Sequence, residues 1–427
     1  MAWILFGSFI ALILLRVPIS ISIGTATLLT FLFSDFSSAL QIIPQQMLEG
    51  VNKASLTAVP FFIMAGNLMN ATGVTERIFN FANALVGHLK AGLAQVNILS
   101  SMIFAGISGA AVADCAGLGA IEIKAMRERG YKPDFAAAIT VASSVVGPLI
   151  PPSIGLVLYA FLAQQSIERM FLAGLIPGLL VGVSLMLYVR LRAETQAFPT
   201  QPAASVQEVI ATAKHGVLAL VAPAIILGSI MFGLVTATEA GVLACLYCAA
   251  IGLWYRELTW QKFFDALSDT AMMTAVIMII ISFSIAMGWL LAIDQTPQKL
   301  ASAVFSLTQN KHIFLALLLL FVIVIGCVVE GVPAMLILVP TLLPLIDAFG
   351  IDRVHFGIII QLGLLIGIAT PPMGIGLYIV SEVGRVRFEQ VTLAILPMLL
   401  PLIAVLLLLT YVPQTVTFLP DLVLGSQ

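Results

Sequence analysis

Two matched proline breaks interrupt apolar stretches of this chain, and they constrain its fold more than any other feature. The first reads GPLIPPS over residues 147–153, and the second reads GIATPPM over residues 367–373. A helix broken inside a bilayer leaves unpaired N–H and C=O groups, each costing on the order of several kcal/mol, unless protein, water or an ion satisfies them. Paired broken helices in corresponding halves are typical of the binding site of a secondary transporter. A shift of 220 positions (367 minus 147) superimposes three residues of the two breaks: Gly147 on Gly367, Pro151 on Pro371 and Pro152 on Pro372.

The composition is that of a membrane protein. Of all residues, 60% are hydrophobic and 9% are charged, whereas soluble domains carry about 25% charged residues. The 19 basic and 21 acidic residues nearly cancel, which gives no reason to expect nucleic-acid binding. Cys245 and Cys248 form a C-x-x-C pair inside a predicted apolar helix, where buried free thiols are favoured over a redox or metal site. The chain has no P-loop and no H-E-x-x-H motif, and we predict that it is not an enzyme.

Most of the chain consists of apolar stretches that can cross a bilayer as helices of about 20 residues. Two further regions, 89–124 and 312–349, each hold two shorter apolar stretches joined by a glycine-containing segment. Each predicts a re-entrant hairpin whose tip is buried in protein, because irregular backbone is not tolerated against lipid. The predicted spans are 3–22, 24–46, 55–75, 134–163, 170–190, 216–236, 238–255, 267–293, 354–382 and 390–412.

The positive charges give this arrangement an orientation. Basic residues flank both ends of the first hairpin, which predicts that this side is cytoplasmic. The second hairpin has fewer basic neighbours and is expected to enter from the opposite side. Both termini then lie in the periplasm, and Arg16 falls on the cytoplasmic side. The basic residues at the first hairpin are Lys90, Lys124, Arg127, Arg129 and Lys132.

These observations predict an all-α polytopic membrane protein built as an inverted repeat. Each half holds five transmembrane helices and one re-entrant hairpin. Because five crossings is an odd number, the second half inserts upside down relative to the first. The predicted boundaries are 1–192 for the first repeat, 193–215 for a cytoplasmic linker and 216–427 for the second repeat, with hairpins at about 89–124 and 312–349 and broken helices at about 134–163 and 354–382.

Hairpin tips and broken helices offer main-chain carbonyls and half-helix ends as ligands. Unwound carbonyls suit Na⁺, and hard cations prefer oxygen. Glycines let backbones approach closely, which can serve tight helix packing instead, but their recurrence beside both breaks favours ion sites. No cofactor and no other metal are expected. The first predicted sodium site comprises Gly106, Ser108, Gly147, Ile150 and Ser153, and the second comprises Gly326, Gly331, Gly367, Thr370 and Met373.

Ionisable and hydroxyl side chains near the breaks predict a substrate path. Asp114 and Glu330 stand near the hairpin tips, and such groups at membrane depth point to function. Each could attract Na⁺, carry a proton, pair with a base or cap a half-helix. Ser143 and Ser144 lie one turn before the first break, although serines in membrane helices often bond to the preceding turn. The predicted path comprises these four residues together with Pro151, Pro152, Pro371 and Pro372.

Several motifs resemble one transporter family over essentially the whole chain. They are FAGISGAAVADCAGLGAIEI, MRERGYKPDFAAAITVASSVVGPLIPPSI and IATPPMGIGLYIVS, with LLRVPISISIG and VPFFIMAGNLMNATGVTERI nearer the N-terminus. Together they resemble the large membrane subunit of TRAP (tripartite ATP-independent periplasmic) transporters. The resemblance implies the elevator fold of the ion-transporter superfamily, Na⁺ coupling, a small four-helix membrane subunit and a periplasmic substrate-binding protein. The small subunit is fused to the N-terminus in some relatives; this chain starts with its own first span, so a separate subunit is expected.

The leading hypothesis is Na⁺-driven import of a small organic acid, such as sialic acid or a C4-dicarboxylate, across the bacterial inner membrane. One alternative is a stand-alone Na⁺- or H⁺-coupled carboxylate carrier of the same superfamily, which would work without partners. Another is a channel or an intramembrane enzyme. A channel would conduct faster than a carrier can cycle, and an enzyme would need a catalytic dyad, which the sequence does not offer.

Overall fold

The described part of the chain folds into helices and contains no strand, which confirms the all-α prediction. The computed structural model describes residues 1–427 except 16, 35–39, 195–197 and 426–427. Arg16 and part of the predicted linker 193–215 therefore lie outside the described residues. Within these described residues, six helices are long and apolar enough to cross a membrane: Ile167–Arg192, Ala237–Trp254, Trp260–Ile293, Lys311–Val328, Gly331–Ala348 and Phe388–Tyr411.

The N-terminal region is divided more finely than the sequence analysis predicted. In place of the spans 3–22 and 24–46, the structure has three shorter helices, so that prediction is wrong in its boundaries. Pro18 directly precedes the second helix and Pro44 lies in the first turn of the third, where a missing N–H is tolerated. Prolines therefore begin helices here. The three helices are α1 (Ala2–Leu14), α2 (Ile19–Leu32) and α3 (Ile42–Val51).

The predicted span 55–75 also ends early. Its helix stops at Ala71, and Gly73, with φ of +63°, turns the chain into a further helix that was not predicted. Glycine adopts this left-handed conformation without steric cost. The short 3₁₀ turn Ala54–Thr57 precedes α4 (Ala58–Ala71), and α5 (Val74–Val86) follows it.

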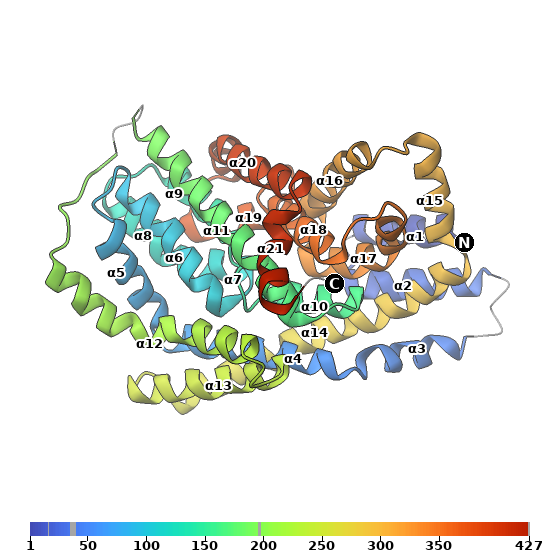
Figure 1. Ribbon diagram of the computed structural model, residues 1–427, viewed down its shortest axis with the longest axis horizontal. Helices are drawn as coiled ribbons and strands as arrows, with labels where there is room; N and C mark the ends of the chain where they lie inside the picture. The colour runs from blue at the N-terminus through green and yellow to red at the C-terminus, as the bar shows by residue number, and fades with distance from the viewer. Residues whose placement is uncertain (16, 35–39, 195–197, 426–427) are drawn as a thin grey trace.

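One group of helices forms a layer along one side of the molecule, and we call it the scaffold layer (Figure 1). Helix α4 packs against α13 and α14, and α14 also contacts α2 and α3. Helix α14 begins at Trp260, and its first turns carry the aromatic residues Trp260, Phe263 and Phe264. The layer comprises α2, α3, α4, α13 (Ala237–Trp254) and α14 (Trp260–Ile293), and α12 (Val206–Met231) adjoins it through α13.

A second group of helices holds both hairpins and both breaks, and we call it the hairpin group. The first hairpin is α6 (Gly92–Ser108) followed by α7 (Ala111–Ala113), the π-helical turn Asp114–Leu118 and α8 (Gly119–Glu128). The second is α16 (Lys311–Val328) with α17 (Gly331–Ala348). The broken helices are α9 (Pro133–Ser144) with α10 (Ile154–Ala163), and α18 (Arg353–Ile368) with α19 (Ile375–Gly384).

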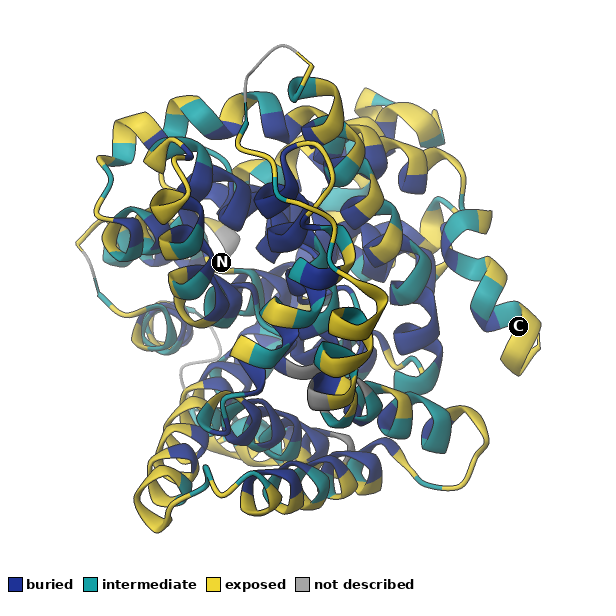
Figure 2. Cartoon of the chain, turned by 90° about the vertical axis from the view of Figure 1, so that its left-hand side faces the viewer, coloured by how far each residue is buried: buried dark blue, intermediate teal, exposed yellow. Residues whose placement is uncertain are grey.

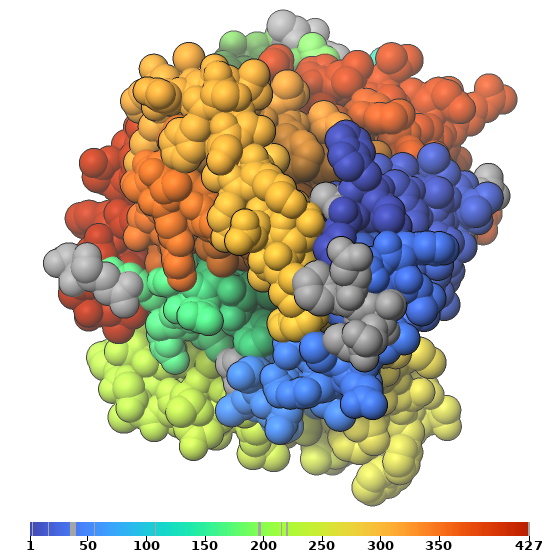
Figure 3. All heavy atoms as spheres, turned by 90° about the vertical axis from the view of Figure 1, so that its right-hand side faces the viewer, coloured from blue at the N-terminus to red at the C-terminus, as the bar shows by residue number. Residues whose placement is uncertain are grey.

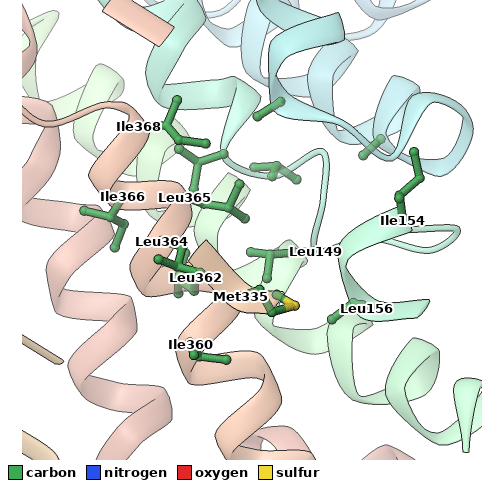
Figure 4. Packing of buried hydrophobic residues seen from close by; sticks show 14 of the residues in the cluster. Leu149, Ile154, Leu156, Met335, Ile360, Leu362, Leu364, Leu365, Ile366 and Ile368 are labelled. Atoms are coloured by element: carbon green, nitrogen blue, oxygen red, sulfur yellow. The ribbon is translucent and has the colours of Figure 1, made fainter. Parts of the chain in front are cut away.

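Buried residues concentrate in the interior of the molecule, whereas helices at the periphery show exposed outer faces (Figure 2). The two broken helices share one apolar core: Leu149 and Leu156 lie close to Met335, Ile360 and Leu364 (Figure 4). Helix α11 (Ile167–Arg192) contacts α6, α10, α18, α20 (Phe388–Tyr411) and α21 (Gln414–Leu424). On the face shown in Figure 3, α15 (Thr296–Leu307) lies on the same side of the molecule as the N-terminal helices.

Candidate functional site

The tip of the first hairpin lies directly on the first helix break. Gly109 has φ of +60° and joins the two arms of the hairpin. A Cβ atom at Gly109 would lie 2.5 Å from the carbonyl oxygen of Pro152, and one at Gly106 would lie 2.6 Å from Pro223 and 3.6 Å from the oxygen of Pro151. Both glycines therefore allow the tip backbone to approach neighbouring groups at distances that a side chain would prevent.

Asp114 is the central polar residue of this contact. It is 2% exposed, and its Oδ1 accepts a hydrogen bond of 2.6 Å from the hydroxyl of Ser108. Its Oδ2 is buried and has no hydrogen-bond partner among the described residues. A Cβ at Gly147 would lie 2.8 Å from this oxygen and 3.2 Å from the carbonyl oxygen of Ser144. Ser108, Asp114 and Gly147 thus meet around one unsatisfied carboxylate oxygen.

The other residues of the first predicted sodium site point elsewhere. The Ser153 hydroxyl donates to the carbonyl oxygen of Pro148 at 2.6 Å and accepts from the N–H of Leu156, so it caps the N-terminus of α10. The side chain of Ile150 packs against Gly178 of α11. The structure therefore does not bring these two side chains to Asp114.

The second hairpin meets the second break through glycine backbones. A Cβ at Gly367 would lie 2.5 Å from the Cα of Gly326, and one at Gly326 would lie 2.7 Å from the carbonyl oxygen of Leu364. Gly331 begins α17, and a Cβ at this position would lie 4.0 Å from the Cβ of Leu364. This packing is tight, and it also brings main-chain atoms of the tip and the break together.

Two residues of the second predicted sodium site are less enclosed. The Thr370 hydroxyl donates to the carbonyl oxygen of Ile366 at 2.6 Å, which leaves its oxygen lone pairs available. The side chain of Met373 is 54% exposed. The breaks Pro151–Pro152 and Pro371–Pro372 both contain a cis peptide bond.

Ser143 and Ser144 lie inside the packed hairpin group. The Ser143 hydroxyl donates to Oδ1 of Asn97 at 2.7 Å and accepts from Ser101 at 3.0 Å. The Ser144 hydroxyl donates to the carbonyl of Val141 and accepts from the Cys115 thiol at 3.1 Å. Neither serine lines the cavity described next.

A cavity of about 460 Å³ lies where the two hairpin tips, the two broken helices and α14 meet. This volume falls within the range of small-molecule sites, about 300–1,000 Å³. Most of its walls are apolar. The hairpin tips contribute Gly109–Ala113 and Glu330–Pro333; the broken helices contribute Pro148, Ile154, Gly155, Gln361, Leu364, Leu365 and Ile368; and α14 contributes Met272, Met273, Val276, Ile277 and Ile280, with Ala116 completing the set.

The cavity has few polar groups. Glu330 is its one charged lining residue among those the structure describes, and Gln361 is its one side-chain amide there. The Gln361 amide donates to the carbonyl oxygen of Pro148 at 3.3 Å and so links the two broken helices. The N-terminal residues of α10 and α17 also line the cavity, and helix N-termini favour negative charge.

Sequence reasoning therefore named some residues at this place and missed others. Glu330 and Gly331 line the cavity, whereas Asp114 lies behind it at the tip contact. Gln361 and the methionines of α14 were not singled out. For Gln361 the available signal was an isolated amide within an apolar helix before the second break. In the described ranges, no three His, Cys, Asp or Glu side chains form a group able to hold a metal ion.

Comparison with known proteins gives a consistent result. Residues 6–415 match the family described as "Tripartite ATP-independent periplasmic transporter, DctM component". The chain is 44% identical over 398 residues to the sialic acid TRAP transporter large permease protein SiaM of Vibrio cholerae, covering 93% of each chain. It is 32% identical over 436 residues to the C4-dicarboxylate TRAP transporter large permease protein DctM of Rhodobacter capsulatus, covering 99% of each.

Solved structures show the same fold at much lower sequence identity. The YdaH transporter of Alcanivorax borkumensis matches with a TM-score of 0.63 at 15% identity, covering 89% of each chain. The MtrF protein of Neisseria gonorrhoeae matches with a TM-score of 0.54 at 13% identity, covering 90% of this chain and 85% of its own. From the family match and the close relatives, this chain belongs to the DctM family and is a large permease subunit of a TRAP transporter.

Proposed function

We propose that this chain is the translocation subunit of a Na⁺-coupled importer of a small organic acid. The observation that carries the proposal is the cavity enclosed by both hairpin tips, both helix breaks and α14. Broken helices that meet at one cavity can bind a substrate and its coupling ions together, because their free main-chain groups need partners.

The proposed mechanism is an elevator. The hairpin group carries most of the cavity lining, and the scaffold layer contributes one helix, α14. The α14 side chains on this wall are methionine, isoleucine and valine. Among the described residues, none of these side chains forms a hydrogen bond to a hairpin tip. An apolar wall of this kind suits sliding of one group past the other, with the substrate held by the moving one.

The proposed first sodium site is built around Asp114. Its unpartnered Oδ2, the Ser108 hydroxyl and the main-chain carbonyls near Gly147 offer the oxygen ligands that a hard cation prefers. A buried carboxylate without a base nearby needs a cation or a proton for charge balance. Gly106 permits the close approach, and any contribution from Ile150 or Ser153 would come from main-chain oxygens.

The proposed second sodium site lies at the contact of the second tip with the second break. It would use main-chain carbonyls near Gly326 and Gly367 together with the Thr370 hydroxyl. Gly331 borders both this contact and the cavity. Met373, with its exposed thioether, is the least favoured ligand of the set, since Na⁺ prefers oxygen.

The substrate proposed for the cavity is an organic acid such as sialic acid or a C4-dicarboxylate. Relatives named for each of these substrates are 44% and 32% identical to this chain. Glu330 and Gln361 are the polar side chains that a substrate would meet there. The proposed partners are a small four-helix membrane subunit and a periplasmic substrate-binding protein, as membership of a tripartite family suggests.

The proposed location is the bacterial inner membrane, with both termini in the periplasm and the two halves arranged as an inverted repeat. Helices α9 and α18 begin 220 positions apart, at Pro133 and Arg353, and α10 and α19 begin 221 positions apart, at Ile154 and Ile375. This regular offset supports two equivalent units, each with one broken helix.

Reconstituted uptake tests the proposal. The chain and its small subunit are placed in proteoliposomes, and labelled substrate uptake is measured with and without the binding protein and an inward Na⁺ gradient. Uptake that requires all components supports the tripartite importer. Uptake by this chain alone would favour a stand-alone carrier, and uptake driven equally well by a proton gradient without Na⁺ would overturn the sodium coupling.

Cross-linking tests the elevator. In a background without the four native cysteines, Val332→Cys and Met273→Cys place one thiol on the second hairpin tip and one on α14, both at the cavity. A bifunctional thiol reagent that joins them should stop transport, and reduction of a cleavable reagent should restore it. Full transport by the cross-linked protein would contradict the elevator.

A further inference from the structure

Glu122 is a buried carboxylate that the proposed transport cycle does not use. It lies on α8, in the second arm of the first hairpin, with 0% of its surface exposed. Neither Oε1 nor Oε2 has a hydrogen-bond partner among the described residues. An ionised carboxylate in such surroundings is very costly, so a group of this kind is normally neutralised. The structure therefore calls for something that neutralises Glu122.

A π-helical turn brings Glu122 into line with Asp114. Residues Asp114–Leu118 form this turn, and α8 follows directly. A π turn holds about 4.4 residues and an α turn about 3.6, so one of each advances about eight residues. Asp114 and Glu122 are eight positions apart and share one face of the arm.

The surroundings of Glu122 offer no basic partner. Helix α8 packs against α6, α9, α19 and the π turn. Among these, α6 has no charged residue, α9 has only Asp134, α19 has only Glu382, and the π turn has Asp114 and Cys115. The basic residues of α8 itself are engaged elsewhere: Lys124 is near Glu128 at the surface, and Arg127 donates to the carbonyl oxygen of Gly384.

Asp114 and Glu122 therefore need different neutralising partners. Asp114 lies beside a serine hydroxyl and main-chain oxygens, which can complete the coordination of a cation. Among the described residues, no serine hydroxyl or main-chain oxygen is bonded to Glu122. A cation would need such oxygens as further ligands, whereas a proton binds the carboxylate itself. We propose that Glu122 is a proton-binding site inside the first hairpin and that its proton sets the cation affinity of the Asp114 site.

The sign and size of this coupling follow from the geometry. Protonated Glu122 is neutral, whereas ionised Glu122 adds a negative charge that attracts a cation at Asp114. Two helical turns advance about 11 Å, and at that separation, with an effective dielectric constant of about 20, one charge changes cation affinity by about tenfold. By linkage, Na⁺ at Asp114 equally weakens proton binding at Glu122.

Infrared spectroscopy of the purified protein in lipid nanodiscs tests the proton directly. The wild type should show a protonated-carboxyl C=O band that Glu122→Gln removes and Glu128→Gln, on the exposed face of the same helix, leaves in place. Glu122→Asp keeps the carboxyl and should shift this band, which preserves the test if the glutamine variant does not fold. A band unchanged by both Glu122 variants would overturn the proposal.

Sodium binding tests the coupling, which rests on the proposed cation site at Asp114. Radioactive Na⁺ binding is measured for the wild type, Glu122→Gln and Asp114→Asn from acidic to alkaline pH. Wild type and Glu122→Gln should bind Na⁺ equally at acidic pH, and the wild type should bind about tenfold more tightly at alkaline pH. A ratio that stays constant with pH would refute the coupling. If Asp114→Asn binds Na⁺ like the wild type, the sodium site fails instead, while the infrared result still decides the proton site.

Discussion

The contact between the two glycine backbones at the second hairpin allows a sharp test of the site geometry. A methyl group at Gly367 would lie 2.5 Å from the Cα of Gly326, and its near neighbours are all backbone atoms. Backbone cannot rotate away as a flexible side chain can, so Gly367→Ala must separate the tip from the break. Inserting a methylene-sized group into a packed core lowers the free energy of unfolding by about 1–3 kcal/mol. Because no neighbouring side chain can move aside here, we expect a value in the upper part of that range.

The same chain offers matched controls for this substitution. Gly288 lies in α14 with no atom within 4 Å of an added Cβ, so Gly288→Ala should be tolerated. Gly363 precedes Gly367 by about one turn of α18, and its added Cβ would meet only the Val322 side chain, at 2.8 Å. Gly363→Ala therefore tests crowding by a side chain on the same helix and should be intermediate in its effect.

The assay combines thermal unfolding in detergent with a Na⁺ titration of transport. Gly367→Ala should unfold at a lower temperature than Gly288→Ala and should need more Na⁺ for half-maximal transport, because the proposed ligands near the tip are displaced. If Gly367→Ala lowers stability but leaves the Na⁺ dependence unchanged, the glycines serve packing alone. If it matches Gly288→Ala in both measurements, the close backbone contact itself is refuted.

Three further predictions concern single side chains. Asp114→Asn should raise the Na⁺ concentration needed for half-maximal uptake by tenfold or more, on the order of 1.4 kcal/mol, and an unchanged Na⁺ titration would contradict the first site. Thr370→Ala should raise that concentration without lowering the amount of folded protein, which size-exclusion chromatography checks; loss of folded protein would instead indicate a packing role. Arg77→Ala removes a half-buried ion pair with Glu257 at 2.6 Å and should destabilise the protein by about 0.5–1 kcal/mol, with normal Na⁺ dependence; a shift in Na⁺ dependence would show that this pair acts on the ion sites.

Local chemistry explains which parts of the fold could be read from the sequence. The helix breaks lie where the proline pairs stand, because proline removes an N–H and cannot continue a helix. The same rule applies near the N-terminus, where Pro18 and Pro44 lie at helix starts inside the predicted spans 3–22 and 24–46. The length of the apolar stretches alone predicts the wrong helix boundaries there. Gly73 ends one helix and begins another, which the apolar pattern does not reveal.

The composition of the cavity could be read from the sequence only in part. Glu330 was found because a carboxylate in an apolar hairpin is conspicuous. Gln361 and the α14 methionines come to the cavity through contacts between segments far apart in the chain, which spacing along the sequence does not reveal. The sequence does not distinguish Glu122 from the surface charges of α8, because only its complete burial in the fold separates it from Glu128 on the same helix.

The most direct test of sodium-coupled transport is to measure two fluxes in the same proteoliposomes. Labelled substrate and radioactive Na⁺ are followed together in vesicles that hold the chain, its small subunit and the binding protein. We expect substrate entry to carry Na⁺ with it in a fixed ratio, and we expect Asp114→Asn and Thr370→Ala each to raise the Na⁺ concentration at which this coupled entry is half-maximal. Substrate entry without accompanying Na⁺ would contradict the coupling and with it both proposed sodium sites.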